Sequence, residues 1–248
     1  MASRVLQRGD TVTAPLLLVT GTGTGIGKTH VTAALIGAWC RALTERGTPQ
    51  PQVAGLKPVE TGVVPGAATD AATLEQVSTF HVKRFPPPYM LARAVSPHLA
   101  AADEARVIEL PVIREYVDSV RAQADAVVVE LPGGLFSPLG PALSNADVAR
   151  ALEADAILLV APDRLGVLHD VAATTRAAAA MGLSLSGIVL VAPDHADAST
   201  GSNAAELKLV TTVPLVAQLP RATVAELTAH ADVGALVSQL LTPSPSRP

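Results

Sequence analysis

The sequence predicts an α/β fold of the doubly wound type, a single domain with one mostly parallel sheet and helices on both faces. Short continuous apolar segments alternate along the chain with longer segments of helical periodicity. This alternation is typical of parallel strands joined by crossover helices. Hydrophobic residues make up 49% of the 248 residues and aromatic residues only 2%. A core built from Val, Leu, Ile and Ala suits strands that are buried on both faces.

The expected strands are compact apolar segments, and the expected helices lie between them. Strands are predicted at 16–20, 53–56, 126–129, 156–160, 187–191 and 213–216. Helices are predicted from 29 to about 47, near 70–77, from 111 to about 123, near 168–181, near 224–229 and at 233–241. Apart from the helix near 70–77, the segment 61–96 is expected to consist of loops, because it is rich in proline. We expect a loose leader at 1–14, one domain over 15–241 and a disordered tail at 242–248.

Charge and cysteine content narrow the possible partners and compartment. The net charge of −4 provides no general attraction for nucleic acid or an anionic membrane. The single cysteine, Cys40, lies in an apolar helical segment, which favours packing and fits a reducing compartment. The longest apolar segments, such as 156–161, are too short to cross a bilayer. We therefore expect a cytoplasmic protein that binds neither nucleic acid nor a membrane.

The segment Gly21–Thr29 reads Gly-Thr-Gly-Thr-Gly-Ile-Gly-Lys-Thr and lies between the first predicted strand and the first predicted helix. Glycines allow successive backbone N–H groups to surround a phosphate, and the helix N-terminus adds a positive dipole. Lys28 would reach the β- and γ-phosphates, and the Thr29 hydroxyl would bind Mg²⁺. A flexible turn capped by Thr29 is the alternative, but Gly-Lys-Thr at this junction strongly favours a P-loop. The first glycine lies one residue earlier than in the common pattern, so this loop is one residue longer.

Three further charged residues follow strand ends or begin a helix, where a parallel sheet places its ligands. Glu130 ends an apolar strand, and Asp70 begins the helix near 70–77. Both carboxylates are hard oxygen ligands suited to Mg²⁺. Lys57 ends the second strand and could project toward a transferred phosphate. The alternatives are a solvated strand end for Glu130, a helix cap for Asp70 and a solvent-directed side chain for Lys57.

These segments together resemble the ATP-dependent dethiobiotin synthetase family, of which the chain looks like a divergent member. The resemblance covers most of residues 16–221, with agreement in both order and spacing. The matching motifs are 21–29, Lys-Pro-Val-Glu-Thr-Gly at 57–62, Thr-Asp-Ala at 69–71, Ser-Pro-His at 96–98, Val-Val-Glu-x-x-Gly-Gly at 128–134, Leu-Gly at 165–166 and Leu-Pro at 219–220. The resemblance implies a homodimer that uses ATP and CO₂ to close a cyclic urea on 7,8-diaminononanoate in biotin synthesis.

The resemblance also implies residue roles. Mg²⁺ would be held by Thr29, Asp70 and Glu130, and Lys28 and Lys57 would neutralise the charge that moves between phosphate and carbamate. Thr24 and Thr61 would orient the substrate amines or the carbamate, with Gly166 and His169 near the substrate. Leu165 and Gly166 of one subunit would help to cover the neighbour's site. Nucleotide contacts are implied at Gly25, Ile26, Gly27, Lys28, Thr29, His30, Asp70, Glu130, Leu131, Pro132, Gly133, Val191, Leu219, Pro220 and Arg221.

Three departures from the family pattern concern specificity. The family's Glu-Gly-Ala-Gly-Gly is Glu-Leu-Pro-Gly-Gly at 130–134, and Pro132 removes one backbone N–H. The family's Leu-Gly-x-x-Asn-His is Leu-Gly-Val-Leu-His-Asp at 165–170, a segment expected to meet the substrate carboxylate. An Asn often found near the base corresponds to Val191. Nucleotide base preference and substrate identity therefore stay open.

Other functions remain compatible with the same motifs. The chain could be a related P-loop ligase that acts on another amine or carboxylate, or a homologue without turnover. A nucleotide-switched scaffold similar to partitioning ATPases would share the fold. Those ATPases generally carry an additional lysine near the start of the loop, where this chain has Gly23. That difference argues against the switch function.

Overall fold

The computed structural model describes residues 13–240. Within this range a parallel six-stranded sheet has the order β10-β9-β8-β1-β5-β2. Its strands are β1 (Leu16–Gly21), β2 (Val53–Leu56), β5 (Ala126–Glu130), β8 (Ala156–Pro162), β9 (Gly187–Val191) and β10 (Leu215–Leu219). From the central β1 the chain extends the sheet first toward β2 and then toward β10. The predicted doubly wound α/β class is confirmed.

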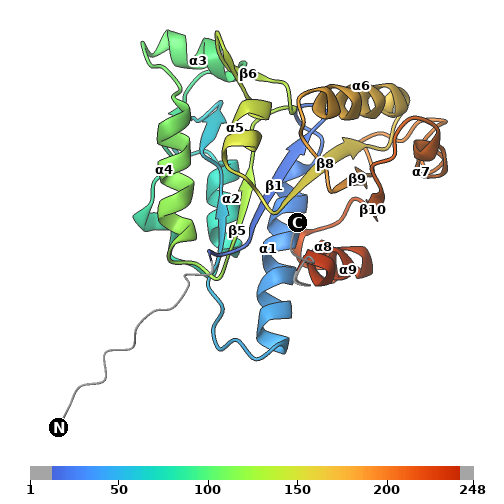
Figure 1. The fold of residues 1–248 in the computed structure, drawn as a ribbon, viewed down its shortest axis with the longest axis horizontal. Coiled ribbons are helices and arrows are strands. Elements are labelled where there is room, and N and C mark those ends of the chain that lie inside the picture. Colours follow the sequence, from blue (N-terminus) through green and yellow to red (C-terminus); the bar gives the residue numbers. More distant parts are fainter. Residues whose placement is uncertain (1–12, 241–248) are drawn as a thin grey trace.

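Helices cover both faces of this sheet (Figure 1). Alternate residues of β1 show the division, since Leu16 and Leu18 join one core cluster and Leu17 and Val19 join the other. The first cluster packs against α3 (Pro97–Asp103), α4 (Leu110–Arg121), α5 (Asn145–Ala151) and α6 (Val167–Ala180). The second packs against α1 (Lys28–Glu45), α2 (Asp70–Val77), α8 (Val224–Thr228) and α9 (Ala231–Leu240). The sheet is therefore a buried middle layer.

Several short elements have no counterpart among the sequence predictions. The loops expected in 61–96 are only part of what lies there, because the segment also holds the 3-10 helix η1 (Val82–Arg84) and β4 (Tyr89–Leu91). Strand β4 pairs in parallel with β3 (Val59–Thr61), beside the main sheet. The remaining additions are β6 (Pro138–Gly140), β7 (Leu143–Ser144), α3, α5, α7 (Asn203–Glu206) and η2 (Leu207–Leu209).

The last strand lies later than the prediction of 213–216. It begins at Leu215 because Pro214 has no N–H to donate, although its carbonyl accepts a hydrogen bond from the Ile188 N–H at 2.8 Å. The pairing with β9 then continues to Leu219. The end of the last predicted helix, residue 241, lies outside the described residues, as do the tail at 242–248 and residues 1–12 of the expected leader.

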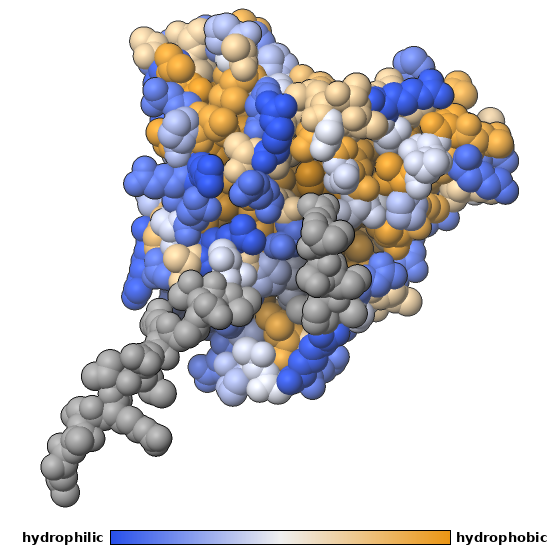
Figure 2. Space-filling view, viewed as in Figure 1, coloured by the Kyte–Doolittle hydropathy of each residue, from blue (hydrophilic) through white to orange (hydrophobic). Residues whose placement is uncertain are grey.

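The visible surface mixes residues of both kinds. In Figure 2, hydrophilic residues in blue and hydrophobic residues in orange are interspersed over the face that carries α4 and α6. The most exposed large apolar residues include Leu165 at 73%, Val107 at 71% and Leu209 at 70%. Among residues 13–240, no helix has both the length and the apolar character needed to span a bilayer.

Candidate nucleotide- and magnesium-binding site

A cavity of about 780 Å³ lies at the carboxyl ends of the strands. It extends from the β1–α1 turn to the segments that follow β9 and β10. Its walls are formed by Thr24, Gly25, Ile26, Gly27, Lys28, Thr29, His30, Lys57, Glu60, Thr61, Asp70, Thr73, Glu130, Pro132, Gly133, Pro162, Arg164, Val191, Ala192, Pro193, Asp194, His195, Pro220, Arg221, Ala222 and Leu227. In open parallel sheets this edge is where ligands bind.

The turn between β1 and α1 is a cradle of backbone donors. In the described part of the chain, no protein group accepts a hydrogen bond from the N–H groups of residues 23–30. Gly25 and Gly27 have φ values of +69° and +90°, a conformation that strains other L-residues. Free N–H groups at the start of an 18-residue helix attract an anion such as phosphate.

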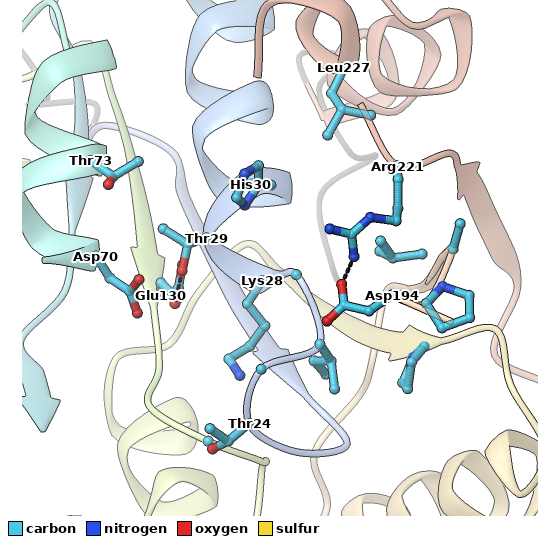
Figure 3. A pocket seen from close by; sticks show the side chains of 18 of the residues that line it. Thr24, Lys28, Thr29, His30, Asp70, Thr73, Glu130, Asp194, Arg221 and Leu227 are labelled. Atoms are coloured by element: carbon cyan, nitrogen blue, oxygen red, sulfur yellow. Dashed lines mark hydrogen bonds and ion pairs between the residues drawn. The ribbon is translucent and has the colours of Figure 1, made fainter. Parts of the chain in front are cut away.

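Lys28 lies at the centre of this cradle (Figure 3). Its side chain is buried, and Nζ donates a hydrogen bond to the Gly23 carbonyl at 2.7 Å. Burial lowers the pKa of Lys28 to about 8, although the Glu130 charge opposes this shift. A buried amine of this kind gains an ionic partner when a phosphate enters the cradle.

Two carboxylates from different parts of the sequence meet at Lys57. Lys57 Nζ lies 2.5 Å from Glu130 Oε1 and is also bonded to Asp70 Oδ2. The Thr29 hydroxyl donates to Glu130 Oε1 at 3.1 Å. Figure 3 shows Thr29, Asp70 and Glu130 together on one side of the cavity.

Burial and charge act against each other in this cluster. Burial alone would lower the pKa of Lys57, but the Glu130 and Asp70 carboxylates outweigh it and raise that pKa. For Asp70, burial would raise the pKa, but the Lys57 charge and its hydrogen bond lower it. Lys57 is 5% exposed and Glu130 0% exposed, so neither is a solvated strand end. The cluster therefore holds its charges by pairing them.

The same oxygen atoms suit Mg²⁺. Glu130 Oε2 is buried and has no hydrogen-bond partner among the described residues. A carboxylate oxygen in this state, beside Thr29 Oγ1 and the Asp70 carboxylate, forms a set of hard ligands that phosphate oxygens can complete. No cluster of three or more His, Cys, Asp or Glu side chains suited to a metal occurs within 13–240. The fit to Mg²⁺ thus depends on two carboxylates and one hydroxyl.

The loop after β5 reaches the cradle despite its proline. Asn145 Nδ2, at the start of α5, donates to the Pro132 carbonyl at 2.5 Å and to the Gly134 carbonyl at 2.8 Å. The Gly134 N–H donates to Ser137 Oγ at 2.9 Å. The loop is therefore held by two of its carbonyls and by the Gly134 N–H, and none of these bonds needs an N–H at Pro132.

The far end of the cavity is formed by the segments after β9 and β10. Arg221 and Asp194 form an ion pair there, as Figure 3 shows, and Leu227 lies on the same side. Both partners of this ion pair are exposed, at 60% and 70% of the side chain. Val191 is 8% exposed and supplies an apolar surface there. This end therefore offers both apolar and charged groups to a nucleotide base.

Four predicted site residues lie outside this cavity. Leu131 and Leu219 are buried in the core at 1% and 2% exposure, so they support the loops that line the cavity. Gly166 and His169 are exposed beyond Arg164 and do not line the cavity of their own chain. Asp70 is the first residue of α2, and Thr69 is its N-cap, so the capping alternative for Asp70 is wrong.

Sequence reasoning missed several lining residues. They are Glu60, Thr73, Ala192, Pro193, Asp194, His195, Ala222 and Leu227. The turn at 162–166 follows the strand predicted at 156–160, and it contributes Pro162 and Arg164, as its position after a strand end predicts. The same rule would have identified the residues that follow β9 and β10, since carboxyl ends share one edge. Glu60 lies within the motif at 57–62 without a role implied for it, and nothing in the local sequence distinguishes Thr73 from an ordinary surface residue.

A free-amide cradle at the first strand-to-helix turn of a parallel sheet defines the P-loop nucleotide-binding class, and the chain falls in that class. Residues 16–228 match the family described as an AAA domain. The chain is 37% identical to the ATP-dependent dethiobiotin synthetase BioD of Anaeromyxobacter dehalogenans, over 82% of this chain and 89% of the relative. It is 36% identical to the protein of the same name from Ralstonia nicotianae, over 89% and 96%. The chain belongs to the ATP-dependent dethiobiotin synthetase family.

Solved structures support the fold assignment. A ParA family ATPase from Chlorobium tepidum superposes with a TM-score of 0.55 at 12% identity, over 92% of this chain and 98% of that one. The cell division ATPase MinD of Pyrococcus furiosus gives 0.51 at 19% identity, over 92% and 96%. At these identities the likeness concerns the fold alone.

Proposed function

We propose that this chain is an ATP-dependent cyclo-ligase that closes the urea ring of dethiobiotin on 7,8-diaminononanoate, with CO₂ as the source of the carbonyl group. Membership of the dethiobiotin synthetase family supports the reaction. The single observation that carries it is the meeting of Lys57, Asp70 and Glu130 beside the phosphate cradle. A cation between two carboxylates, next to Lys28, is suited to charge that passes between a phosphate and a carbamate.

The reaction needs positioning more than acid–base catalysis. A neutral substrate amine adds to CO₂ and loses a proton, which gives a carbamate. One carbamate oxygen attacks the γ-phosphorus and displaces ADP, which gives a carbamic–phosphoric anhydride. The neighbouring amine attacks the carbonyl carbon, phosphate leaves, and the ring closes with loss of a second proton. Each step moves negative charge over a short distance, where fixed cations stabilise it.

The residues divide this work among them. The backbone of 23–30 and Lys28 hold the triphosphate, and Lys57 neutralises the oxygen that bridges phosphate and carbamate. Thr24 and Thr61 orient the amines or the carbamate from the cavity wall. Thr29, Asp70 and Glu130 would hold Mg²⁺, which supplies Lewis-acid neutralisation of phosphate charge.

We further propose that two copies of the chain form the working enzyme, in the cytoplasm. Gly166 and His169 lie outside their own cavity, and the neighbouring Leu165 is 73% exposed. An exposed leucine beside a turn implied to contact substrate is readily explained if that turn covers the site of a second subunit. Sedimentation equilibrium with Leu165→Asp as the variant tests this arrangement, and a monomeric wild-type chain would contradict it.

Product formation tests the function directly. The protein is incubated with diaminononanoate, bicarbonate, Mg²⁺ and each nucleoside triphosphate in turn, and the cyclic urea is detected by mass spectrometry. We expect dethiobiotin and one phosphate per ring with ATP. Phosphate release without dethiobiotin, under conditions where nucleotide binds, would contradict the proposal.

A related ligase for another amine or carboxylate is the second candidate. The changes at 131–132 and 168–170 favour it, because the second segment is the one implied to meet the substrate carboxylate. Phosphate release that depends on a different diamine or carboxylate would distinguish this activity. A switch ATPase would instead show partner-stimulated hydrolysis without a small-molecule product, and Gly23 in place of a lysine argues against it.

A further inference from the structure

Glu60 is a buried carboxylate in the cavity wall that the proposed reaction does not use. It is 7% exposed and lies in β3, three residues after Lys57. Strand β3 is held by parallel pairing with β4, in which Glu60 lies opposite Met90. The side chain therefore extends from a fixed section of backbone.

Both oxygens of Glu60 bind the first turn of α2. Oε1 accepts a hydrogen bond from the Asp70 N–H at 2.6 Å, and Oε2 accepts one from the Ala71 N–H at 2.9 Å. Thr69 Oγ1 accepts from the Ala72 N–H at 3.0 Å. The first three amides of the helix thus have protein acceptors, and a distant strand supplies two of them.

The start of α2 depends on these contacts. Helix α2 has 8 residues, a length at which a helix depends on outside contacts for its stability. The segment that leads into it, 64–68, is exposed to solvent. Because Asp70 is the first residue of α2, any fraying of this turn moves its carboxylate away from Lys57.

The geometry separates Glu60 from a role in proton transfer. Burial raises the pKa of Glu60, while the Ala71 and Asp70 amides oppose that shift. Both oxygens are already bonded to backbone N–H groups, so neither is placed to exchange a proton with a substrate. The contacts instead connect Glu60 to the position of Asp70.

We propose that Glu60 is a positioning residue for Asp70, and this inference rests on the proposed function only for the role of Asp70 in holding Mg²⁺. Glu60 locks the first turn of α2 to β3 and so keeps the Asp70 carboxylate opposite Glu130. Groups that orient metal ligands typically change metal affinity by about 10–100-fold when removed. The effect of Glu60 should therefore appear in metal binding itself, without any turnover.

The test compares Glu60→Ala and Glu60→Gln with the wild-type chain. Mn²⁺ is titrated by electron paramagnetic resonance in the presence of a non-hydrolysable ATP analogue. We expect Glu60→Ala to weaken Mn²⁺ binding by about 10-fold or more. Glu60→Gln should have a smaller effect, since its amide keeps one acceptor and turns one donor toward a backbone N–H. Hydrogen exchange of the Asp70 and Ala71 amides, followed by NMR, should accelerate in the same order.

Asp125→Asn is the matched control. Asp125 also accepts a hydrogen bond from a backbone N–H, that of Gln52 at 2.7 Å. This bond lies at the amino-terminal ends of β2 and β5, opposite the ends that carry the cavity. Its variant should bind Mn²⁺ as the wild type does. Unchanged Mn²⁺ affinity in both Glu60 variants would overturn the proposal. If Glu60→Ala does not fold, unchanged Mn²⁺ affinity in Glu60→Gln overturns it. If the wild-type chain binds Mn²⁺ and nucleotide but makes no dethiobiotin, the proposed ligase activity is wrong. The effect of Glu60 on Mn²⁺ binding would still support its positioning role.

Discussion

At the scale of single residues, the site is built around charges that pair with one another before any ligand is bound. Lys57 lies between Asp70 and a fully buried Glu130. An isolated buried carboxylate is unfavourable, so Lys57 compensates Glu130 in the protein alone. In the proposed mechanism, bound Mg²⁺ gives the carboxylates a second cation, and Lys57 then turns toward the transferred phosphate. One lysine would thus serve both stability and chemistry.

Replacing Lys57 with alanine should separate these two roles. We expect kcat to fall by about 100- to 1000-fold, the usual effect of losing one electrostatic contact to a transition state. Nucleotide affinity should change little, because the cradle of 23–30 is intact. In the absence of Mg²⁺, the free energy of unfolding should decrease by about 3 kcal/mol, since Glu130 loses its partner while the half-exposed Asp70 is solvated. Steady-state kinetics and urea unfolding measure both effects.

The exposed lysine Lys208 provides the control, because it lies on η2 and does not line the cavity. Lys208→Ala should leave kcat and stability close to wild type. Near-normal turnover in Lys57→Ala would show that its charge is not needed for the reaction.

Nucleotide binding should weaken above pH 8. Burial lowers the pKa of Lys28 to about 8 in the free protein, so its amine is increasingly neutral as the pH rises past that value. A bound phosphate favours the charged form, and binding must then take up a proton. Below pH 8 the amine is already charged and this dependence disappears. Isothermal titration calorimetry between pH 7.5 and 9.5, in buffers of different ionisation enthalpy, measures the nucleotide affinity and the number of protons taken up.

Lys28→Arg should remove this pH dependence, because a guanidinium stays charged throughout that range. Equal nucleotide affinity of the wild-type chain at pH 7.5 and 9.5, with no proton uptake, would show that the Lys28 amine stays charged in the free protein.

At the scale of elements, the sequence identified the long segments and overlooked the short ones. Strands such as β2 and β9, and helix α2, lie at the predicted residues because apolar runs and turn residues mark both ends. Strands of two or three residues, such as β3 and β7, carry no periodicity that could reveal them. Glu60 was missed for that reason, since its burial follows from the pairing of β3 with β4.

The loop after β5 shows how an element accommodates an unusual residue. Asn145 holds the carbonyls of Pro132 and Gly134 and is itself 0% exposed. We expect Asn145→Leu to release both carbonyls and to loosen the loop that faces the cradle. Buried carbonyls without donors cost about 1–3 kcal/mol each, so stability should fall measurably. The midpoint of thermal unfolding should fall, and the Kd for the ATP analogue should rise.

Asn203→Leu offers a comparison at another buried asparagine, which binds Asp163 at 2.7 Å away from this loop. It should reduce stability as well, with a smaller effect on nucleotide affinity. Equal nucleotide affinity in Asn145→Leu and wild type would show that this hydrogen-bonded loop does not support the nucleotide site.

At the scale of the whole molecule, the fold explains why residues far apart in the sequence form one site. All strands of the main sheet are parallel, so their carboxyl ends share an edge. That rule was enough to predict that 21–29, Lys57 and Glu130 would converge. The position of Asp194 depends on the loop conformation after β9, which no motif specified. Gly166 and His169 do not line the cavity of their own chain, and their proposed role depends on a second subunit.

The most direct test is a crystal structure of the protein with Mg²⁺ and a non-hydrolysable ATP analogue. We expect one Mg²⁺ bound by oxygens of Thr29, Asp70 and Glu130 and by the β- and γ-phosphates, with Lys28 and Lys57 on the γ-phosphate. A triphosphate held elsewhere, or a metal ion that leaves Asp70 and Glu130 paired only with Lys57, would contradict it.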